Sequence, residues 1–385
     1  MTLYASNQGK GQRIIRWGVQ ATPDTAEDLS GASANTAYVT DCELTPKREI
    51  IERRLISPKT HGIPSIVSGE YMEVSATGDI VPRTITSANA SDLPINAHEM
   101  LSGSGWSLTS DSTDKTHTYV LDGQGKQLTV RQIMLNIDNS VHRIKEAHNV
   151  RGDLTISGEA GSVITMSYDG LGANTYNLVE TVTGSAYTGN VVFPSASQQP
   201  LILKNATVQL YNIDEDILYD GGTLGSPGSD GFLKSFTLSC NTNPTLRKNA
   251  IASDGVSGSY LDPDRPSLEL KVEMNDLVVD RFQKNRDAWE IFIKIPQPGA
   301  NSNSMSIICY AHLDGELGLA EVGDGIYVVT LPFLLSYPAD VADNSPEAGT
   351  NPFQAWTTAS NRGVPVLPAS TLPTGLCAIQ FRTES

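Results

Sequence analysis

The order of predicted elements along this chain occurs twice. In each half a strand is followed by a long polar loop, a returning strand and a short helix. The first set comprises residues 47–54, 57–69, 71–76 and 93–101. The second set comprises residues 232–240, 241–266, 267–274 and 276–285. This repeat favours two copies of one β-rich unit, and duplicated units usually serve symmetric assembly or extended surfaces.

The clearest strand pattern is the alternation of apolar and charged residues at 268–274 (LELKVEM). It places four apolar side chains on one face and Glu269, Lys271 and Glu273 on the other, as in a half-buried antiparallel strand. Further strands are predicted at residues 37–44, 116–121, 127–137, 153–158, 163–168, 201–210, 291–295, 305–312, 326–335 and 375–382. Helix is confined to two or three short pieces, so the predicted fold class is all-β with few short helices.

A chain of 385 residues is long for a single core, and two domains are the simplest expectation. We predict an N-terminal arm at residues 1–36, a first β domain at 37–200, a second β domain at 201–335 and a C-terminal arm or extension at 336–385. The first arm is polar and needs a partner surface to become ordered. The long loop at 337–373 is more natural in a subunit that interlocks with its own copies than in an isolated domain.

The charge balance is acidic: 27 Lys and Arg against 43 Asp and Glu give a formal net charge of −16. Such a surface does not favour gripping nucleic acid, which needs clustered cations. It is compatible with a surface past which nucleic acid slides, and equally with an ordinary soluble acidic protein.

A cluster of mixed charge surrounds the first predicted hairpin. Its members are Lys47, Arg48, Glu49, Glu52, Arg53, Arg54 and Lys59. The cluster lacks the interleaved aromatic residues of a nucleic-acid site. Ion pairing between subunits and a solvated face remain as equal interpretations.

Catalytic signatures are absent from the sequence. There is no P-loop, no G-x-S-x-G and no H-E-x-x-H. The acidic loops at 212–216 and 262–264 lack the full calcium-binding pattern. We therefore predict no enzyme activity, no catalytic residue, no metal site and no cofactor.

The four cysteines show neither metal spacing nor a disulfide framework. Cys240 and Cys309 lie in apolar strand-like runs and are predicted to be buried thiols. No stretch has the length of a signal-peptide core or a membrane span. We expect folding in a reducing cytoplasm and no membrane partner.

A Thr45-Pro46 step is followed by an E-x-x-x-R strand at 49–53 and an R-x-x-P-like turn at 54–58. Residues 149–170 contain an R-G strand and a glycine turn, and residues 232–275 contain a later hairpin. Together these segments resemble the tail tube (major tail) proteins of bacteriophages with long, non-contractile tails. The similarity is a pattern of spacing over residues 37–275, and the tail after Ser336 and the polar stretch at 103–115 depart from it.

This resemblance implies β-sandwich or barrel-like units whose sheets close with neighbouring subunits into a ring. Rings stack into the tail tube of a virion, assembled in the host cytoplasm, and genomic DNA passes through without specific binding. The implied partners are the tape measure, tail terminator and distal tail proteins. Two units per chain favour a trimeric ring with pseudo-sixfold symmetry. A hexameric ring is the alternative, with the second unit as a decorating domain.

The tube hypothesis points to two sets of candidate residues. The candidates for acidic side chains that face the lumen are Glu73, Asp79, Glu269 and Glu273, because each lies on or beside a hairpin strand. The strand pattern leaves open which face is luminal. The candidates for contacts between subunits or rings are Arg48, Arg53, Arg54, Lys59 and Arg265.

Two other classes of protein remain as alternatives. One is a capsid-decoration, baseplate or fibre protein, which would also be rich in β structure and arms. The other is an enzyme or carbohydrate-binding module whose tryptophans stack on sugars. The scatter of Trp17, Trp106, Trp289 and Trp356 along the chain favours core or interface roles instead.

Overall fold

The computed structural model describes residues 13–27, 29, 39–51, 66–87, 89, 92–134, 141–181, 199–212, 217–220, 231–252, 255–284, 286, 289–298, 303–323, 325–336 and 377–383. Within this part the fold is almost entirely β. The strands of the first half are β1 (Arg13–Val19), β2 (Val39–Ile51), β3 (Ile66–Asp79), β4 (Trp106–Asp111), β5 (Thr116–Leu121), β6 (Leu128–Met134), β7 (Val141–Glu159) and β8 (Thr165–Thr181).

The strands of the second half are β9 (Thr207–Asn212), β10 (Ile217–Asp220), β11 (Gly231–Ser239), β12 (Pro244–Lys248), β13 (Val256–Leu261), β14 (Ser267–Asn275), β15 (Trp289–Pro296), β16 (Asn303–Leu313), β17 (Gly318–Gly323), β18 (Ile326–Leu335) and β19 (Cys377–Thr383). The described residues contain two helices, α1 (Ala97–Gly103) and α3 (Asp276–Lys284). The predicted all-β class with few short helices is confirmed.

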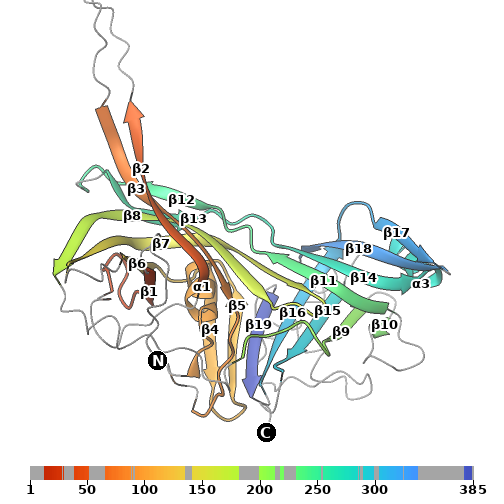
Figure 1. The fold of residues 1–385 in the computed structure, drawn as a ribbon. Coiled ribbons are helices and arrows are strands. Elements are labelled where there is room, and N and C mark those ends of the chain that lie inside the picture. The colour runs from red at the N-terminus through yellow and green to blue at the C-terminus, as the bar shows by residue number, and fades with distance from the viewer. Residues whose placement is uncertain are drawn as a thin grey trace, which may run out of the picture.

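The strands pair into two antiparallel layers (Figure 1). The long sheet has the order β2-β3-β8-β7-β11-β14-β18-β17. The second layer has the order β4-β5-β19-β16-β15-β9-β10 and lies beneath the long sheet in Figure 1. The two layers join where the end of β16 pairs with the end of β18. The pair β1–β6 lies beside the first half of β7, and β12 and β13 form a separate hairpin.

Buried apolar side chains fill the space between the layers as one contiguous cluster that includes residues from β1 to β19. The predicted alternation on β14 is confirmed, because Leu268 and Leu270 are fully buried whereas Glu269 and Lys271 are exposed. Helix α3 adds Phe282, whose ring stacks on Trp289 with centroids 4.5 Å apart. Because the buried cluster contains residues of both halves of the chain, the core crosses the boundary between them.

Strand β2 differs from the sequence prediction of a strand that ends at Thr45-Pro46 and a new strand beyond it. One continuous strand passes through both residues, and its partner β3 begins at Ile66 instead of residue 71. Pro46 lacks an N–H donor, which is compatible with an edge strand. Among the described strands β2 pairs with β3 alone, so Pro46 removes no donor that an inner strand would need.

Two other segments for which no strand was predicted contain strands. Residues 241–266 form the β12–β13 hairpin, which is held to the long sheet by a hydrogen bond of 2.7 Å from the Asn149 side chain to the Ser257 carbonyl. Residues 103–115 contain β4. Helix α1 begins at residue 97 instead of 93, because Ile95 forms a bridge with Val81 before the helix starts.

Both predicted arms contribute a strand to the fold. Within residues 1–36, β1 pairs with β6 along its whole length, and Trp17 is only 1% exposed. The expectation that this arm needs a partner surface is therefore wrong for residues 13–19. Within residues 336–385, β19 lies between β5 and β16. The predicted loop at 337–373, residues 52–54 of the first predicted strand and residues 57–65 of the first predicted loop lie outside the described residues.

We predict that Trp17→Ala lowers the free energy of unfolding of the isolated chain by about 3–5 kcal/mol, because it leaves a large cavity in the core. Urea denaturation followed by circular dichroism measures the change. The control is Leu277→Ala, at an apolar residue that is 73% exposed, for which we expect a change within about 0.5 kcal/mol. Equal stability of Trp17→Ala and the parent chain would mean that β1 is not docked in the free protein.

Candidate functional site

Two successive groups of four strands in the long sheet share one order of pairing. In the first group, β2 pairs with β3, β3 with β8, and β8 with β7. In the second group, β11 pairs with β14, β14 with β18, and β18 with β17. A helix follows the second strand of each group, α1 after β3 and α3 after β14. In both groups the fourth strand in chain order therefore lies between the second and the third.

The two groups are joined edge to edge. The last part of β7 pairs with β11 in antiparallel register, from Thr155 opposite Ser239 to Glu159 opposite Ser235. The third strand of the first group thus borders the first strand of the second group. Backbone hydrogen bonds make the eight strands one continuous sheet across this junction.

The long sheet ends in β2 and β17, which lie at opposite ends of the molecule (Figure 1). Each pairs with a single neighbour among the described strands. Both ends expose apolar side chains: Leu319 and Val322 on β17, and Ile50, Ile51 and Val67 on the β2–β3 hairpin. An unpaired edge with exposed apolar residues is a site of strand addition. Sequence reasoning missed β17, since GLAEVG shows no clear alternation.

The structure brings the four predicted acidic residues to one face of the long sheet. A registered row runs across five strands through Asp79, Thr165, Ser157, Thr237 and Glu269. Residues directly opposite each other share a face, and so do residues an even number of positions apart on one strand. Glu73 therefore lies on the same face as Asp79, and Glu273 on the same face as Glu269.

This acidic face is the one turned away from the core. The neighbouring row consists of Gly78, Met166, Ile156, Leu238 and Leu268, which are buried on the other face. Registered partners of Ser75 and Thr77 on β3 extend the acidic face with Asp41, Glu43 and Asp169, all exposed.

Lysines are interspersed among these acids. Glu73 pairs with Lys47 at 3.1 Å, Glu273 with Lys234 at 2.5 Å, and Glu269 lies 3.8 Å from Lys271. Asp79 differs, because its partial burial raises the pKa of its carboxyl. Exposed ion pairs of this kind contribute little to the stability of the fold. Their main effect is on the electrostatic potential of the acidic face.

Two of the predicted cationic contact residues, Arg48 and Arg265, lie in the described part of the chain, at separate places. Arg48 on β2 pairs with Glu70 at 2.7 Å, and Glu49 pairs with Lys248 of β12 at 2.8 Å. Several charges of the mixed cluster thus form ion pairs within the chain. Arg53, Arg54 and Lys59 lie outside the described residues.

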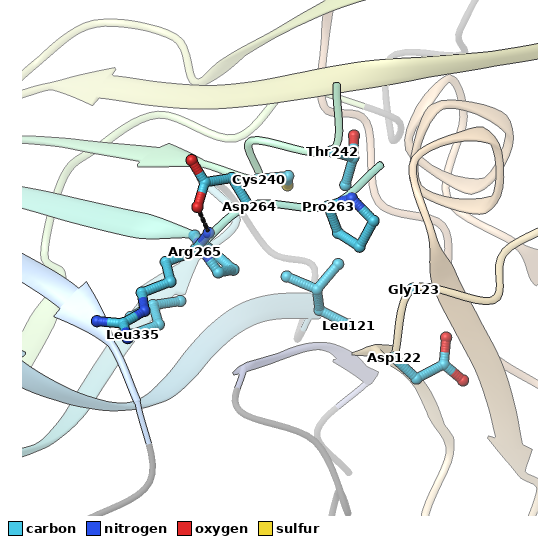
Figure 2. A pocket seen from close by; sticks show the side chains of 10 residues that line it. Leu121, Asp122, Gly123, Cys240, Thr242, Pro263, Asp264, Arg265 and Leu335 are labelled. Carbon is cyan, nitrogen blue, oxygen red and sulfur yellow. Dashed lines mark hydrogen bonds between the residues drawn. The ribbon is translucent and has the colours of Figure 1, made fainter. Parts of the chain in front are cut away.

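Arg265 lies at a hollow of about 370 Å³ where the two halves of the chain meet (Figure 2). Leu121 of the first half and Leu335 of the second line it, together with Pro263. The Arg265 backbone N–H donates a hydrogen bond of 2.7 Å to the Asp264 carboxylate. The hollow is mainly apolar, with Asp122, Thr242, Asp264 and Arg265 as the polar residues of its lining.

Features of other functional classes are missing from the part of the chain that the structure describes. It contains no group of three or more His, Cys, Asp or Glu placed to hold a metal ion. None of its helices has the length and apolarity needed to span a membrane. Trp17, Trp106 and Trp289 are at most 1% exposed and cannot stack on a sugar, and Trp356 lies outside the described residues.

No family model matches the chain, and no curated protein matches its sequence. The continuous sheet, its two free edges and its acidic face are therefore the features from which a function is inferred.

We predict that the double substitution Leu319→Lys and Val322→Lys weakens self-association by about tenfold or more without changing the fold, because it places charge on the apolar edge. Sedimentation velocity over a range of concentrations measures association, and circular dichroism checks the fold. Leu277→Lys is the control, since Leu277 is also exposed but lies on α3. Association of the double variant at the level of the parent chain would contradict a role for β17.

Proposed function

We propose that this chain is a structural virion protein, the tail tube (major tail) protein of a long-tailed bacteriophage. In this proposal its copies form rings that stack into a hollow tube, through which DNA leaves the capsid. The observation that carries the proposal is the β7–β11 junction between two groups of the same strand order. The resemblance of residues 37–275 to this family agrees with it.

The junction inside one chain serves as a template for a junction between chains. Strand β17 has the position in the second group that β7 has in the first, and β2 has the position in the first group that β11 has in the second. If the two groups are copies of one unit, β17 of one chain pairs with β2 of the next. This contact is head-to-tail, and a head-to-tail contact that closes by rotation gives a ring.

The number of chains follows from the two groups per chain. Because the second group continues the same sheet instead of branching from it, each chain contributes two units to the ring. Three chains then supply six units and a pseudo-sixfold ring. Closure of this sheet pairs its backbone edges, apart from Pro46 of β2, which has no N–H to donate, and so covers the exposed edges that promote uncontrolled aggregation. A true hexamer would require the second group to lie outside the ring.

The acidic face is assigned to the lumen. The opposite face of the long sheet is covered by the second layer and the core, so it cannot line a channel. Glu73, Asp79, Glu269 and Glu273 then point toward the passing DNA. A lumen with net negative charge repels phosphates and limits adhesion of the DNA as it moves.

The β2–β3 hairpin is assigned to the contact between stacked rings. It projects beyond the rest of the sheet (Figure 1) and exposes Ile50, Ile51 and Val67. Burial of these side chains against the next ring would remove apolar surface from water. The tape measure, tail terminator and distal tail proteins are the further partners in this proposal.

The register of the junction between chains follows from the registered pairs. Gly78 and Met274 are the next-to-last residues of the second strands β3 and β14. The chain of partners from Gly78 runs through Met166 to Ile156 on β7. The chain of partners from Met274 runs through Tyr327 to Glu321 on β17. Glu321 therefore corresponds to Ile156.

The first strands correspond in the same way. Pro46 pairs with Met72, six residues before Gly78, and Leu238 pairs with Leu268, six residues before Met274. Since Ile156 is opposite Leu238 at the junction inside the chain, Glu321 lies opposite Pro46 of the next chain. In antiparallel register Ala320 then lies opposite Lys47, with both on the acidic face.

Cysteine cross-linking tests this proposal. We predict that a chain carrying Ala320→Cys and Lys47→Cys forms covalent three-chain species on oxidation, since opposed residues in adjacent strands meet the Cα separation of a disulfide. The readout is non-reducing gel electrophoresis with intact mass.

The matched control carries Ala320→Cys and Glu43→Cys. Both positions are exposed, but Glu43 lies four residues, or about 13 Å, from Lys47 along β2. Equal cross-linking of the two pairs would contradict the register. A chain that stays uncross-linked and monomeric at every concentration would contradict the ring and favour a decoration or baseplate component.

A further inference from the structure

Two of the four cysteines face each other in the second layer. Cys309 on β16 and Cys377 on β19 are directly opposed residues in the antiparallel register. Their Sγ atoms lie 2.8 Å apart, and both side chains are 0% exposed. None of the four cysteines forms a disulfide bond in this structure. Sequence reasoning missed the pair, because nothing in the spacing of the cysteines indicates that β19 lies beside β16.

The backbone at this position suits a covalent bond. Opposed residues in an antiparallel pair have Cα atoms about 4.5–5.5 Å apart, which lies within the range of about 4.4–6.8 Å found for disulfides. The two side chains already point at each other. A bond between them therefore needs only side-chain rotation and no separation of the strands.

From this juxtaposition we propose that Cys309 and Cys377 form a disulfide bond once the chain meets an oxidising environment. Two S–H bonds break and one S–S bond forms, with loss of two protons and two electrons. Oxidised glutathione, or another small disulfide, accepts the electrons and is converted to two thiols. The inference does not depend on the tail tube proposal.

A bond at this position would strengthen the attachment of β19 to the second layer. Strand β19 is inserted between β5 of the first half and β16 of the second, so it holds the β4–β5 hairpin to the rest of the second layer. The two cysteines are 68 positions apart in the sequence. A bond across so long a loop restricts the unfolded chain strongly and resists the detachment of β19.

Burial decides when the bond forms and how long it lasts. Burial raises the pKa of the Cys377 thiol, which keeps the reactive thiolate rare in the folded protein. Oxidation thus requires folding or brief local opening. Once formed, the bond is shielded from reductants by the same packing.

The test starts from the full chain purified under reducing conditions. It is incubated with oxidised glutathione in urea just below the unfolding transition, where local opening exposes buried thiols. The remaining thiols are alkylated after full denaturation and counted by intact mass, and a non-reduced digest is mapped. We expect two of the four thiols to be lost, with a cross-linked peptide pair that contains Cys309 and Cys377.

Four free thiols, a glutathione adduct without a cross-link, or a link that involves Cys42 or Cys240 would each overturn the proposal. Two variants sharpen the result. Cys42→Ala, at a buried cysteine of β2, leaves the cross-link unchanged. Cys309→Ala abolishes it. We also expect the oxidised parent chain to unfold at least about tenfold more slowly in urea than the reduced chain, a difference that Cys309→Ala removes.

Discussion

The backbone ladder between β7 and β11 is the interaction on which the rest of the structure depends. It joins two groups of four strands that would otherwise form separate sheets, and it does so with backbone groups that any sequence supplies. The ladder uses the β7 edge of the first group and the β11 edge of the second. Among the described strands, the β2 edge of the first group and the β17 edge of the second therefore stay unpaired at the two ends of the long sheet. An assembly that repeats the same contact between chains needs no new type of interface.

The second layer stabilises this arrangement from one side only. Its central strands β15 and β16 are buried along almost their whole length, and β19 links them to β5. A side-chain hydrogen bond of 3.1 Å from Gln380 to Thr118 adds to that link. Since the apolar core lies between the layers, the opposite face of the long sheet remains polar and carries the acidic residues.

Local sequence pattern predicted the strands that pack against the core. Alternation predicted β14, and the apolar run at residues 291–295 predicted most of β15. Local pattern failed where pairing with distant segments decides the structure. Strand β1 is an apolar patch within an otherwise polar arm and is held by β6, and β12 and β13 lie in a segment without alternation. Pro46 indicated a strand end, but an edge strand tolerates proline.

The candidate site was predictable only in part, for the same reason. The four acidic residues were predicted because each lies on or beside a hairpin strand, and the alternation of β14 indicated a polar face. That they share one face depends on the register of five strands, and register is a tertiary property. The ion pair between Glu49 and Lys248 joins residues 199 positions apart, so the sequence alone could not identify the partner of either residue.

Electron microscopy of the purified protein, with rotational symmetry taken from end-on views, tests the central claim most directly. The account predicts hollow stacked rings with threefold symmetry and six similar inner units, because each chain contributes two groups of strands to one closed sheet. Rings of six whole chains would contradict the equivalence of the two groups. Discrete particles without a channel, at every salt and protein concentration, would contradict the tube itself.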